Sequence, residues 1–461
     1  MTRPNNISYR DYAARVVKKE DGFYRYIFLE YKAEYEHLMQ SGLYEELIQK
    51  ELLIEHKEIQ IEIDDPKVYK LLYPTQIAFQ SYPFEWSYKQ WIKAILAYLK
   101  INHIALKYGM ILKDATPYNI YLTEGKAVMF DTSSFMFFKK NDNWIAYRQF
   151  CETFLSPIVL MHYNGAEWSK LTIAELRGLH LNFVSKQLPL KSWFNLTTLI
   201  NIHLHSRYYG KINTTKNELK KNKGFTVEKL KSLHQMIFKT ITNWVEPYLY
   251  ANKWADYYEN DIESEEYLED KETTIRKWLE TTKPKSVIDL GANTGKFSFI
   301  AAEYAELVIA LEADDNCVDK IEKCIVENKI NNIVAIIGNL TEPSPTLGLL
   351  NNETESIYFR ANSEMALALA ITHHLYITNK MCFDQIAAIL NKFCSKYLIV
   401  EFIEIDDKRV QKLLENNHTN QKDYTESNFI KSFGSYFKIL EIKKIHNSNR
   451  SIILMEKSLN T

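Results

Sequence analysis

The sequence predicts an α/β fold for the C-terminal part of the chain: a doubly wound, Rossmann-like domain with a mixed seven-stranded sheet, preceded by an α+β domain. Three observations lead to this prediction. A short apolar strand runs into a glycine turn and then a helix over residues 285–304. Apolar strands and amphipathic helices alternate after that turn. Two final apolar runs, 436–445 and 451–456, form a hairpin that adds an antiparallel strand.

The glycine turn follows the first predicted strand, residues 286–290. Glycines let the backbone approach a ligand closely, and the start of the next helix offers N–H groups. A dinucleotide fingerprint would need a glycine at position 293, which is Asn. An ordinary strand–helix turn is the alternative to a cofactor site. The candidate cofactor-binding residues here are Asp289, Gly291, Ala292, Asn293 and Gly295.

The second and third predicted strands also end in polar residues. Residues 307–311 are apolar and lead to Glu312, about 20 residues past the turn, where an acid can accept hydrogen bonds from ribose hydroxyls. Residues 332–338 lead to Asn339. Because ligands of open α/β sheets bind at the carboxyl ends of strands, these ends predict a nucleoside site.

Two adjacent histidines follow the fourth predicted strand, residues 364–371. His373 and His374 are the candidate catalytic residues, since an imidazole can take a proton near neutral pH. A hydroxyl acceptor would need such a base, whereas an amine acceptor would not strictly need one. We expect Glu401, at the end of the fifth strand, to orient one imidazole. The alternative is that a histidine caps the next helix or packs in the core.

The N-terminal part predicts a small sheet with one helix, then a long amphipathic helix and a mostly helical region. The predicted strands are residues 22–29, 54–63, 68–73 and 76–80, and the predicted helices are 31–39 and 86–108.

After the long helix, Asp114 and Asn119 are followed by a short strand pair and by Asp131. This layout resembles the catalytic loop of protein kinases and aminoglycoside-type phosphotransferases. The resemblance implies that Asp114 would act as a base, while Asn119 and Asp131 would hold Mg²⁺ on the phosphates of ATP. No other metal site is expected.

The same region departs from the kinase pattern. No glycine-rich phosphate loop lies near residues 15–30, and no strand lysine is evident. Arg25 with Glu34 or Glu36 would be a substitute for the usual ion pair. The alternative is a kinase-like scaffold that packs or binds substrate without transferring phosphate.

Composition excludes several classes of protein. The 57 Lys+Arg and 58 Asp+Glu nearly cancel, which argues against a nucleic-acid binder. The five cysteines include no C-x-x-C, so neither disulfides nor a zinc site is indicated. No apolar run of 18 residues predicts a membrane span, and the first residues lack the apolar core of a signal peptide. We expect a cytoplasmic protein.

The glycine turn, D-x-G-x-N-x-G, resembles motif I of class I S-adenosylmethionine methyltransferases, and Asn339 matches the position that contacts adenine, where that family more often has Asp. The whole chain resembles a bacterial family of two-part methyltransferase-like proteins, some of them host-range nodulation proteins. The matching stretches are Tyr35–Leu43, Ser81–Trp86, Leu112–Asn119, Asp131-Thr132, Asp289–Gly295, Leu367–Leu375 and Glu401-Phe402.

This resemblance implies a methyltransferase that uses S-adenosylmethionine to methylate a hydroxyl or amine of a small molecule or glycan. The expected organisation is a kinase-like domain over residues 1–250 that assists acceptor recognition, a linker and cap segment over 251–283, and a methyltransferase domain over 284–461. One alternative is a bifunctional kinase–methyltransferase with Mg-ATP in the first domain. Another is a nucleoside-binding scaffold without activity.

Overall fold

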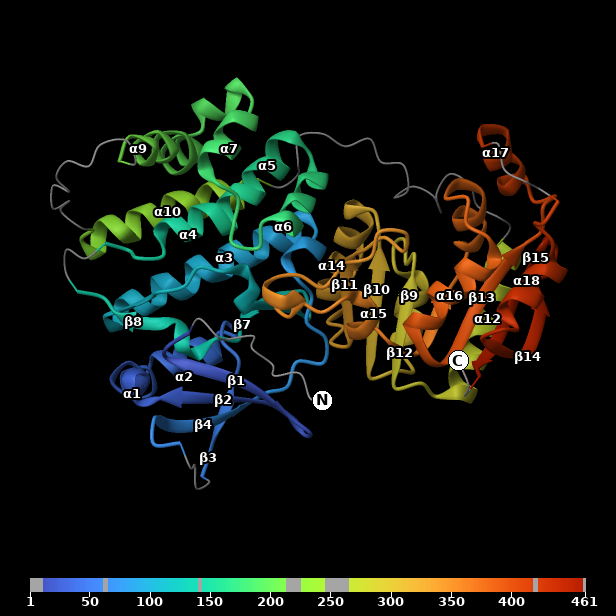
Figure 1. Ribbon diagram of the computed structural model, residues 1–461, viewed down its shortest axis with the longest axis horizontal. Coiled ribbons are helices and arrows are strands. Elements are labelled where there is room, and N and C mark those ends of the chain that lie inside the picture. The colour runs from blue at the N-terminus through green and yellow to red at the C-terminus, as the bar shows by residue number, and fades with distance from the viewer. Residues whose placement is uncertain are drawn as a thin grey trace. The chain divides into compact units, whose positions relative to one another are not determined.

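The computed structural model describes residues 11–60, 65–139, 143–212, 225–244, 265–417 and 422–458. The chain divides into two compact units (Figure 1). The first comprises Met1–Tyr250 and Thr346–Thr354, and the second comprises Ala251–Pro345 and Glu355–Thr461. The boundary at residues 250 and 251 lies outside the described ranges.

The second unit is built on one seven-stranded sheet with the order β11-β10-β9-β12-β13-β15-β14. Strand β15 runs antiparallel to both of its neighbours, while the first five strands are parallel. The predicted mixed seven-stranded sheet is therefore confirmed. Its strands are β9 (Ser286–Leu290), β10 (Leu307–Glu312), β11 (Ile333–Ile337), β12 (Ser363–Ala368), β13 (Cys394–Ile403), β14 (Phe437–Lys444) and β15 (Arg450–Lys457).

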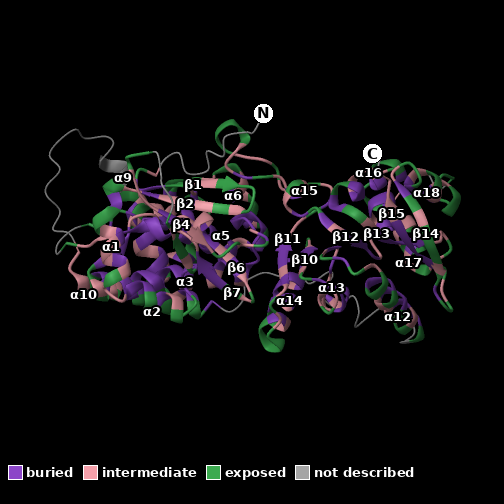
Figure 2. Cartoon of the chain, turned by 90° about the horizontal axis from the view of Figure 1, so that it is seen from below, coloured by how far each residue is buried: buried purple, intermediate pink, exposed green. Residues whose placement is uncertain are grey.

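The central strands of this sheet are buried on both faces. Val287 and Ile288 point to opposite faces of β9, and both are fully buried. The neighbouring strands β10 and β12 are also mostly buried (Figure 2). Such continuous apolar strands are typical of parallel sheets covered by helices. The helices of this unit are α12 (Glu265–Thr282), α13 (Lys296–Ala302), α14 (Asp315–Asn328), α15 (Ile357–Arg360), α16 (Phe383–Phe393), α17 (Lys408–Asn416) and α18 (Glu426–Phe433).

Helix α12 covers most of the described part of the segment that the sequence assigns to a linker and cap. Residues 251–264 of that segment lie outside the described ranges. The apolar face of α12 is buried in the core of the second unit through Ile275, Trp278 and Leu279. Over these residues the chain is a packed helix, because its buried apolar side chains recur at helical spacing.

The first unit begins with a four-stranded antiparallel sheet of order β1-β2-β4-β3. Two small two-stranded sheets, β5–β8 and β6–β7, follow the long helix α3 (Tyr88–Ala105). The strands are β1 (Ala14–Lys19), β2 (Gly22–Phe28), β3 (His56–Ile59), β4 (Val68–Pro74), β5 (Met110–Leu112), β6 (Ile120–Thr123), β7 (Lys126–Met129) and β8 (Phe135–Phe137). The predicted strand over residues 76–80 is wrong, since this segment is irregular.

Helix α3 forms the centre of the first unit. It begins with a capping box in which Ser87 accepts a hydrogen bond from the backbone of Gln90 and Gln90 caps Ser87 in return. Trp91 and Tyr98 lie on its buried face. The helices of this unit are α1 (Lys32–Gln40), α2 (Leu43–Gln49), α3 (Tyr88–Ala105), α4 (Tyr147–Phe150), α5 (Ser156–Asn164), α6 (Leu171–Ala174), α7 (Leu181–Gln187), α8 (Leu196–Thr198), α9 (His205–Ile212) and α10 (Val227–Thr242).

Within the described ranges, no helix is both long and apolar enough to cross a membrane.

The stability of the first unit is expected to depend on pH, because three of its histidines have lowered pKa values. Burial lowers the pKa of His56 and of His162 to about 4, and that of His234 to about 3. An unfolded histidine titrates near 6.5, so the unfolded state binds more protons between these values. We therefore expect stability to be fully present above about pH 6.5 and to fall as the pH drops toward 4, measured by urea unfolding.

A matched pair of variants tests this assignment. His162→Gln should reduce the dependence of the unfolding midpoint on pH, whereas His180→Gln should not, because His180 is largely exposed. A midpoint in the wild-type chain that does not change between about pH 7.5 and 4.5 would contradict the prediction.

Candidate functional site

The turn after β9 requires glycine at both ends. Gly291 has φ +76° and Gly295 has φ +86°, a conformation that L-residues rarely adopt. A Cβ on Gly291 would lie 2.9 Å from Ile371 Cδ1, and one on Gly295 would lie 2.9 Å from Ile321 Cγ1. Both positions therefore need glycine on steric as well as backbone grounds.

Backbone hydrogen bonds attach this turn to the end of β10. The N–H groups of Gly291 and Ala292 donate to the Leu311 carbonyl over 2.9 and 3.2 Å, and Gly295 N–H donates to the Ala292 carbonyl over 2.8 Å. The position of the turn is therefore set by the neighbouring strand. Asn293, between the glycines, has φ +50°.

Glu312, the last residue of β10, is bound by backbone donors on both carboxylate oxygens. Oε2 accepts from Asn293 N–H over 2.7 Å, and Oε1 accepts from Ala313 and Asp314 over 2.7 and 3.0 Å. Burial raises the pKa of Glu312, against the lowering effect of these donors. A carboxylate offers about four acceptor positions, so about one remains for a ligand.

Asp289 lies inside β9 and is buried. Its Oδ2 accepts from the Ser298 hydroxyl of α13 over 2.7 Å. Burial is the largest influence on its carboxyl group and raises the pKa to about 6. Asp289 therefore holds α13 against the strand behind the turn.

Asn339 lies beyond the end of β11 and is exposed. Its Oδ1 accepts from the backbone N–H and the hydroxyl of Thr341, over 3.0 and 2.9 Å. This fixes the side-chain oxygen, so any ligand contact would come from the amide Nδ2.

The fourth strand ends earlier than the sequence predicts. Strand β12 stops at Ala368, and Ala370 has φ +52°, which turns the chain out of the sheet. Ala370 N–H donates to Glu401 Oε2 over 2.8 Å, and the Thr372 hydroxyl donates to the Glu401 carbonyl over 2.7 Å. Contacts with Glu401 thus determine the path of the chain just before the two histidines.

His373 and His374 lie in different surroundings although their ring centroids are 4.2 Å apart. His373 is fully buried, and neither ring nitrogen has a hydrogen-bond partner among the described residues. Burial, followed by the charges of His374 and Arg450, lowers its pKa well below the usual value. His374 is partly exposed, and burial and Arg409 lower its pKa to about 4. Both imidazoles are therefore neutral at physiological pH.

Glu401 does not orient a histidine, so this expectation is wrong. Its carboxylate is fully buried and accepts from Lys271 Nζ over 2.6 Å and from the Tyr267 hydroxyl over 2.7 Å. Arg450 Nη1 lies 3.7 Å from its Oε1. The cations hold the pKa of Glu401 below its ordinary value, although burial opposes them. A buried carboxylate needs full-charge partners, which neutral imidazoles cannot supply.

Sequence reasoning missed Lys271 and Arg450. Lys271 lies on the apolar stripe of α12, four residues from Tyr267 and Ile275. A lysine on such a stripe signals a buried carboxylate partner elsewhere in the chain. In the same way, the single acid in the apolar strand β13 signals a buried cation. Pairing them requires the fold.

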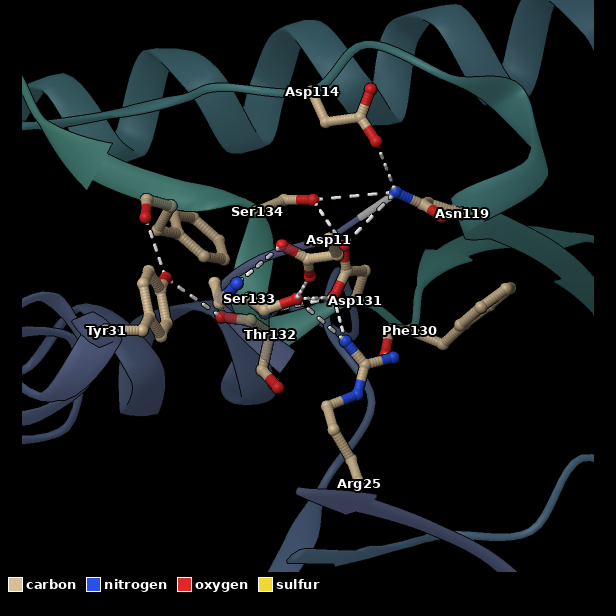
Figure 3. A network of polar contacts seen from close by, with 12 residues as sticks. Asp11, Arg25, Tyr31, Asp114, Asn119, Phe130, Asp131, Thr132, Ser133 and Ser134 are labelled. Carbon is tan, nitrogen blue, oxygen red and sulfur yellow. Dashed lines mark hydrogen bonds and ion pairs between the residues drawn. The ribbon is translucent and has the colours of Figure 1, made fainter. Parts of the chain in front are cut away.

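In the first unit the structure brings Asp114, Asn119 and Asp131 together (Figure 3). Asn119 Nδ2 lies 3.3 Å from Asp114 Oδ2 and 3.3 Å from Asp131 Oδ2. Burial raises the pKa of Asp114. No group of three or more His, Cys, Asp or Glu side chains suited to a metal ion occurs in the parts of the chain that the structure describes.

The proposed ion pair of Arg25 with Glu34 or Glu36 is wrong. Arg25, on β2, donates to Asp131 Oδ1 and also to the Phe130 carbonyl over 3.1 Å. Glu36 instead accepts from the Tyr69 hydroxyl over 2.7 Å. The Arg25 side chain leaves its strand on the side that faces Asp131.

Comparison with known proteins gives one curated relative at significant similarity. No family model matches the chain. The nodulation protein NoeA of Rhizobium meliloti (strain 1021) is 25% identical over 383 residues, which covers 82% of this chain and 80% of that protein. This match supports the resemblance drawn from the sequence.

Several solved structures resemble part of the chain. The N-methyltransferase NodS of Bradyrhizobium japonicum WM9, in complex with S-adenosyl-L-homocysteine, is 7% identical, with 45% of this chain and 93% of that chain covered and a TM-score of 0.33. Magnesium protoporphyrin IX methyltransferase of Synechocystis PCC 6803, with bound SAH, is 15% identical, with 44% and 92% covered and a TM-score of 0.32. The fold assignment rests instead on the sheet of the second unit, in which five parallel strands are followed by an antiparallel hairpin in the order β11-β10-β9-β12-β13-β15-β14.

Removing one charge of the buried Lys271–Glu401 pair should strongly destabilise the second unit. Lys271→Met would leave the carboxylate without its closest cation, which typically costs about 3–5 kcal/mol. We expect the free energy of unfolding of the second unit to fall by about this amount in urea titrations of the full chain.

Lys277→Met is the matched control on the same helix, since Lys277 pairs with Glu441 at the surface. It should change stability by less than about 1 kcal/mol. Adding Glu401→Gln to Lys271→Met should recover part of the loss. If Lys271→Met lowers the free energy of unfolding no more than the control does, the buried pair does not stabilise the second unit as predicted.

Proposed function

We propose that this chain is an S-adenosylmethionine-dependent methyltransferase whose cofactor binds to the second unit. The observation that supports this most directly is the coupling of the glycine turn to Glu312. Asn293 N–H, inside the turn, donates to the carboxylate that ends the neighbouring strand. The turn lies where the strand order reverses, because β9 is flanked by β10 and β12. Ligands of open α/β sheets bind at this reversal point.

The residues present fit this cofactor. In the proposal, Glu312 uses its remaining acceptor position for one ribose hydroxyl, and Asn339 offers its amide to the adenine edge. Gly291 and Gly295 keep the turn free of side chains, while Asp289 acts from behind it through Ser298. S-adenosylmethionine supplies an activated methyl group on a sulfonium. The protein therefore mainly aligns the donor and the acceptor.

Of the two histidines, His374 is the better candidate for contact with the acceptor. His373 has no exposed surface, so a molecule arriving from solvent cannot touch it in this conformation. His374 is partly exposed and neutral at physiological pH, so it can accept a proton from a hydroxyl. We propose His374 as the base for a hydroxyl acceptor and His373 as the residue that packs against it.

The acceptor class in this proposal is a hydroxyl or amine on a small molecule or glycan, with the first unit assisting its recognition. The similarity to a nodulation protein covers most of both chains, which supports a shared organisation of the two proteins. The second candidate is a bifunctional enzyme in which the first unit also transfers phosphate from Mg-ATP. Asp114, Asn119 and Asp131 converge as this candidate requires, but the Arg25 guanidinium already occupies Asp131.

Calorimetry of the full chain against S-adenosylmethionine, NAD and Mg-ATP, run in parallel, tests these proposals. We expect binding of S-adenosylmethionine and of its demethylated product, and none of NAD. Binding of NAD in preference to S-adenosylmethionine would overturn the methyltransferase assignment, because both cofactors can use an acid at the second strand end.

Glu312→Gln should weaken S-adenosylmethionine binding. Loss of a charged hydrogen bond costs about 1.5–3 kcal/mol, or roughly ten- to a hundredfold in the dissociation constant. Glu306→Gln, at an exposed position just before the same strand, is the control and should bind as the wild type does. If both variants bind S-adenosylmethionine with the same affinity, Glu312 does not bind the ribose.

His374→Ala should lower turnover by roughly 10²–10⁴-fold with cofactor affinity nearly unchanged, if the acceptor is a hydroxyl. The control is His446→Ala, at an exposed position of the same unit. Because the pKa of His374 is about 4, its own titration should raise the rate only near that pH and leave it flat around neutrality. Full turnover in His374→Ala would eliminate the base role and favour an amine acceptor.

A further inference from the structure

The kinase-like cluster of the first unit has no acceptor position left for a metal ion on Asp131. Oδ1 accepts from Arg25, from Ser133 N–H over 3.0 Å and from the Ser133 hydroxyl over 2.6 Å. Oδ2 accepts from the Ser134 hydroxyl over 2.6 Å and from Asn119 Nδ2 over 3.3 Å. A carboxylate has about four acceptor positions, so these donors fill it.

Asn119 presents its donor to the cluster. Its Nδ2 lies between the carboxylates of Asp114 and Asp131 and the Ser134 hydroxyl (Figure 3). The reverse orientation would place the amide oxygen against two carboxylates. A metal ligand would need that oxygen to face the ion. Asp114 is also occupied, since its Oδ1 accepts from Gln149.

The positive charge at the centre of this cluster is that of a protein side chain, the Arg25 guanidinium. The Arg25 guanidinium is buried and reaches Asp131 across 106 positions of sequence. Burial lowers the pKa of Arg25 to about 10, so it keeps its charge at neutral pH. Asp11 borders the cluster, because its Oδ2 lies 2.8 Å from the Ser133 hydroxyl, whose one proton can go either to Asp11 or to Asp131.

We propose that the Arg25 guanidinium takes the place of a divalent cation in the Asp114–Asn119–Asp131 cluster, so that the first unit does not bind Mg-ATP. The contact then serves to fasten the N-terminal sheet to the loops after β5 and β7. This proposal is independent of the methyltransferase assignment, since every residue involved lies in the first unit.

A competing role for Arg25 makes the opposite prediction. An arginine on this strand could instead bind phosphate and contact Asp131 only when no nucleotide is present. Removing it would then weaken binding of Mg-ATP. Under our proposal, removing it frees an acceptor position on Asp131, close to Asp114, and creates affinity for a divalent cation.

The test uses Mn²⁺ as a paramagnetic probe, with binding followed by electron paramagnetic resonance, together with calorimetry of Mg-ATP. We expect no Mg-ATP binding in the wild type, and Arg25→Gln should bind Mn²⁺ at least about tenfold more tightly than the wild type. Arg15→Gln, at an exposed position of the adjacent strand, should behave as the wild type does. Adding Asp131→Asn to Arg25→Gln should abolish the gain.

Two results would overturn the proposal. One is wild-type binding of Mg-ATP that Arg25→Gln loses, which would assign Arg25 to phosphate binding. The other is a folded Arg25→Gln variant, judged by circular dichroism, that gains no Mn²⁺ affinity. If Arg25→Gln does not fold, the wild-type titration with Mg-ATP still decides, because binding there contradicts the proposal and its absence supports it.

Discussion

The arrangement of the second unit depends on one buried carboxylate, that of Glu401. It joins parts of the chain that are distant in sequence: Lys271 from helix α12, Ala370 from the loop after β12, and Arg450 from strand β15. Isolated charges are expensive to bury, and this one is retained because two cations and two hydrogen-bond donors surround it. The loop that carries the two histidines is thereby fixed at the centre of the sheet edge.

A second constraint couples two neighbouring strands at the proposed cofactor site. The carbonyl of Leu311 accepts from the glycine turn, and the carboxylate of the next residue, Glu312, accepts from Asn293. Strand β10 therefore supports the turn after β9 with both its backbone and its last side chain. Preorganisation of this kind reduces the entropy that must be lost when a ligand binds.

Much of this architecture could be predicted from the sequence, because its signals are local. The alternation of apolar strands and helices defines the sheet, and the glycine turn with Glu312 marks the edge at which we propose that the cofactor binds. In the first unit, the spacing of Asp114, Asn119 and Asp131 is enough to predict their convergence. The partners of buried charges could not be predicted. We expected Glu401 to contact a histidine and Arg25 to pair with Glu34 or Glu36. Only the fold shows which oppositely charged side chain lies closest to each.

The position of Arg450 affects how the protein can be made. A ribosome that has synthesised Lys271 and Glu401 has yet to produce the guanidinium beside them. Strand β15 also inserts between β13 and β14, so the parallel part of the sheet keeps an open edge until that strand emerges. During translation the second unit therefore exposes an unpaired strand and an incompletely neutralised acid. A chaperone that covers that edge of β13 would act at this stage.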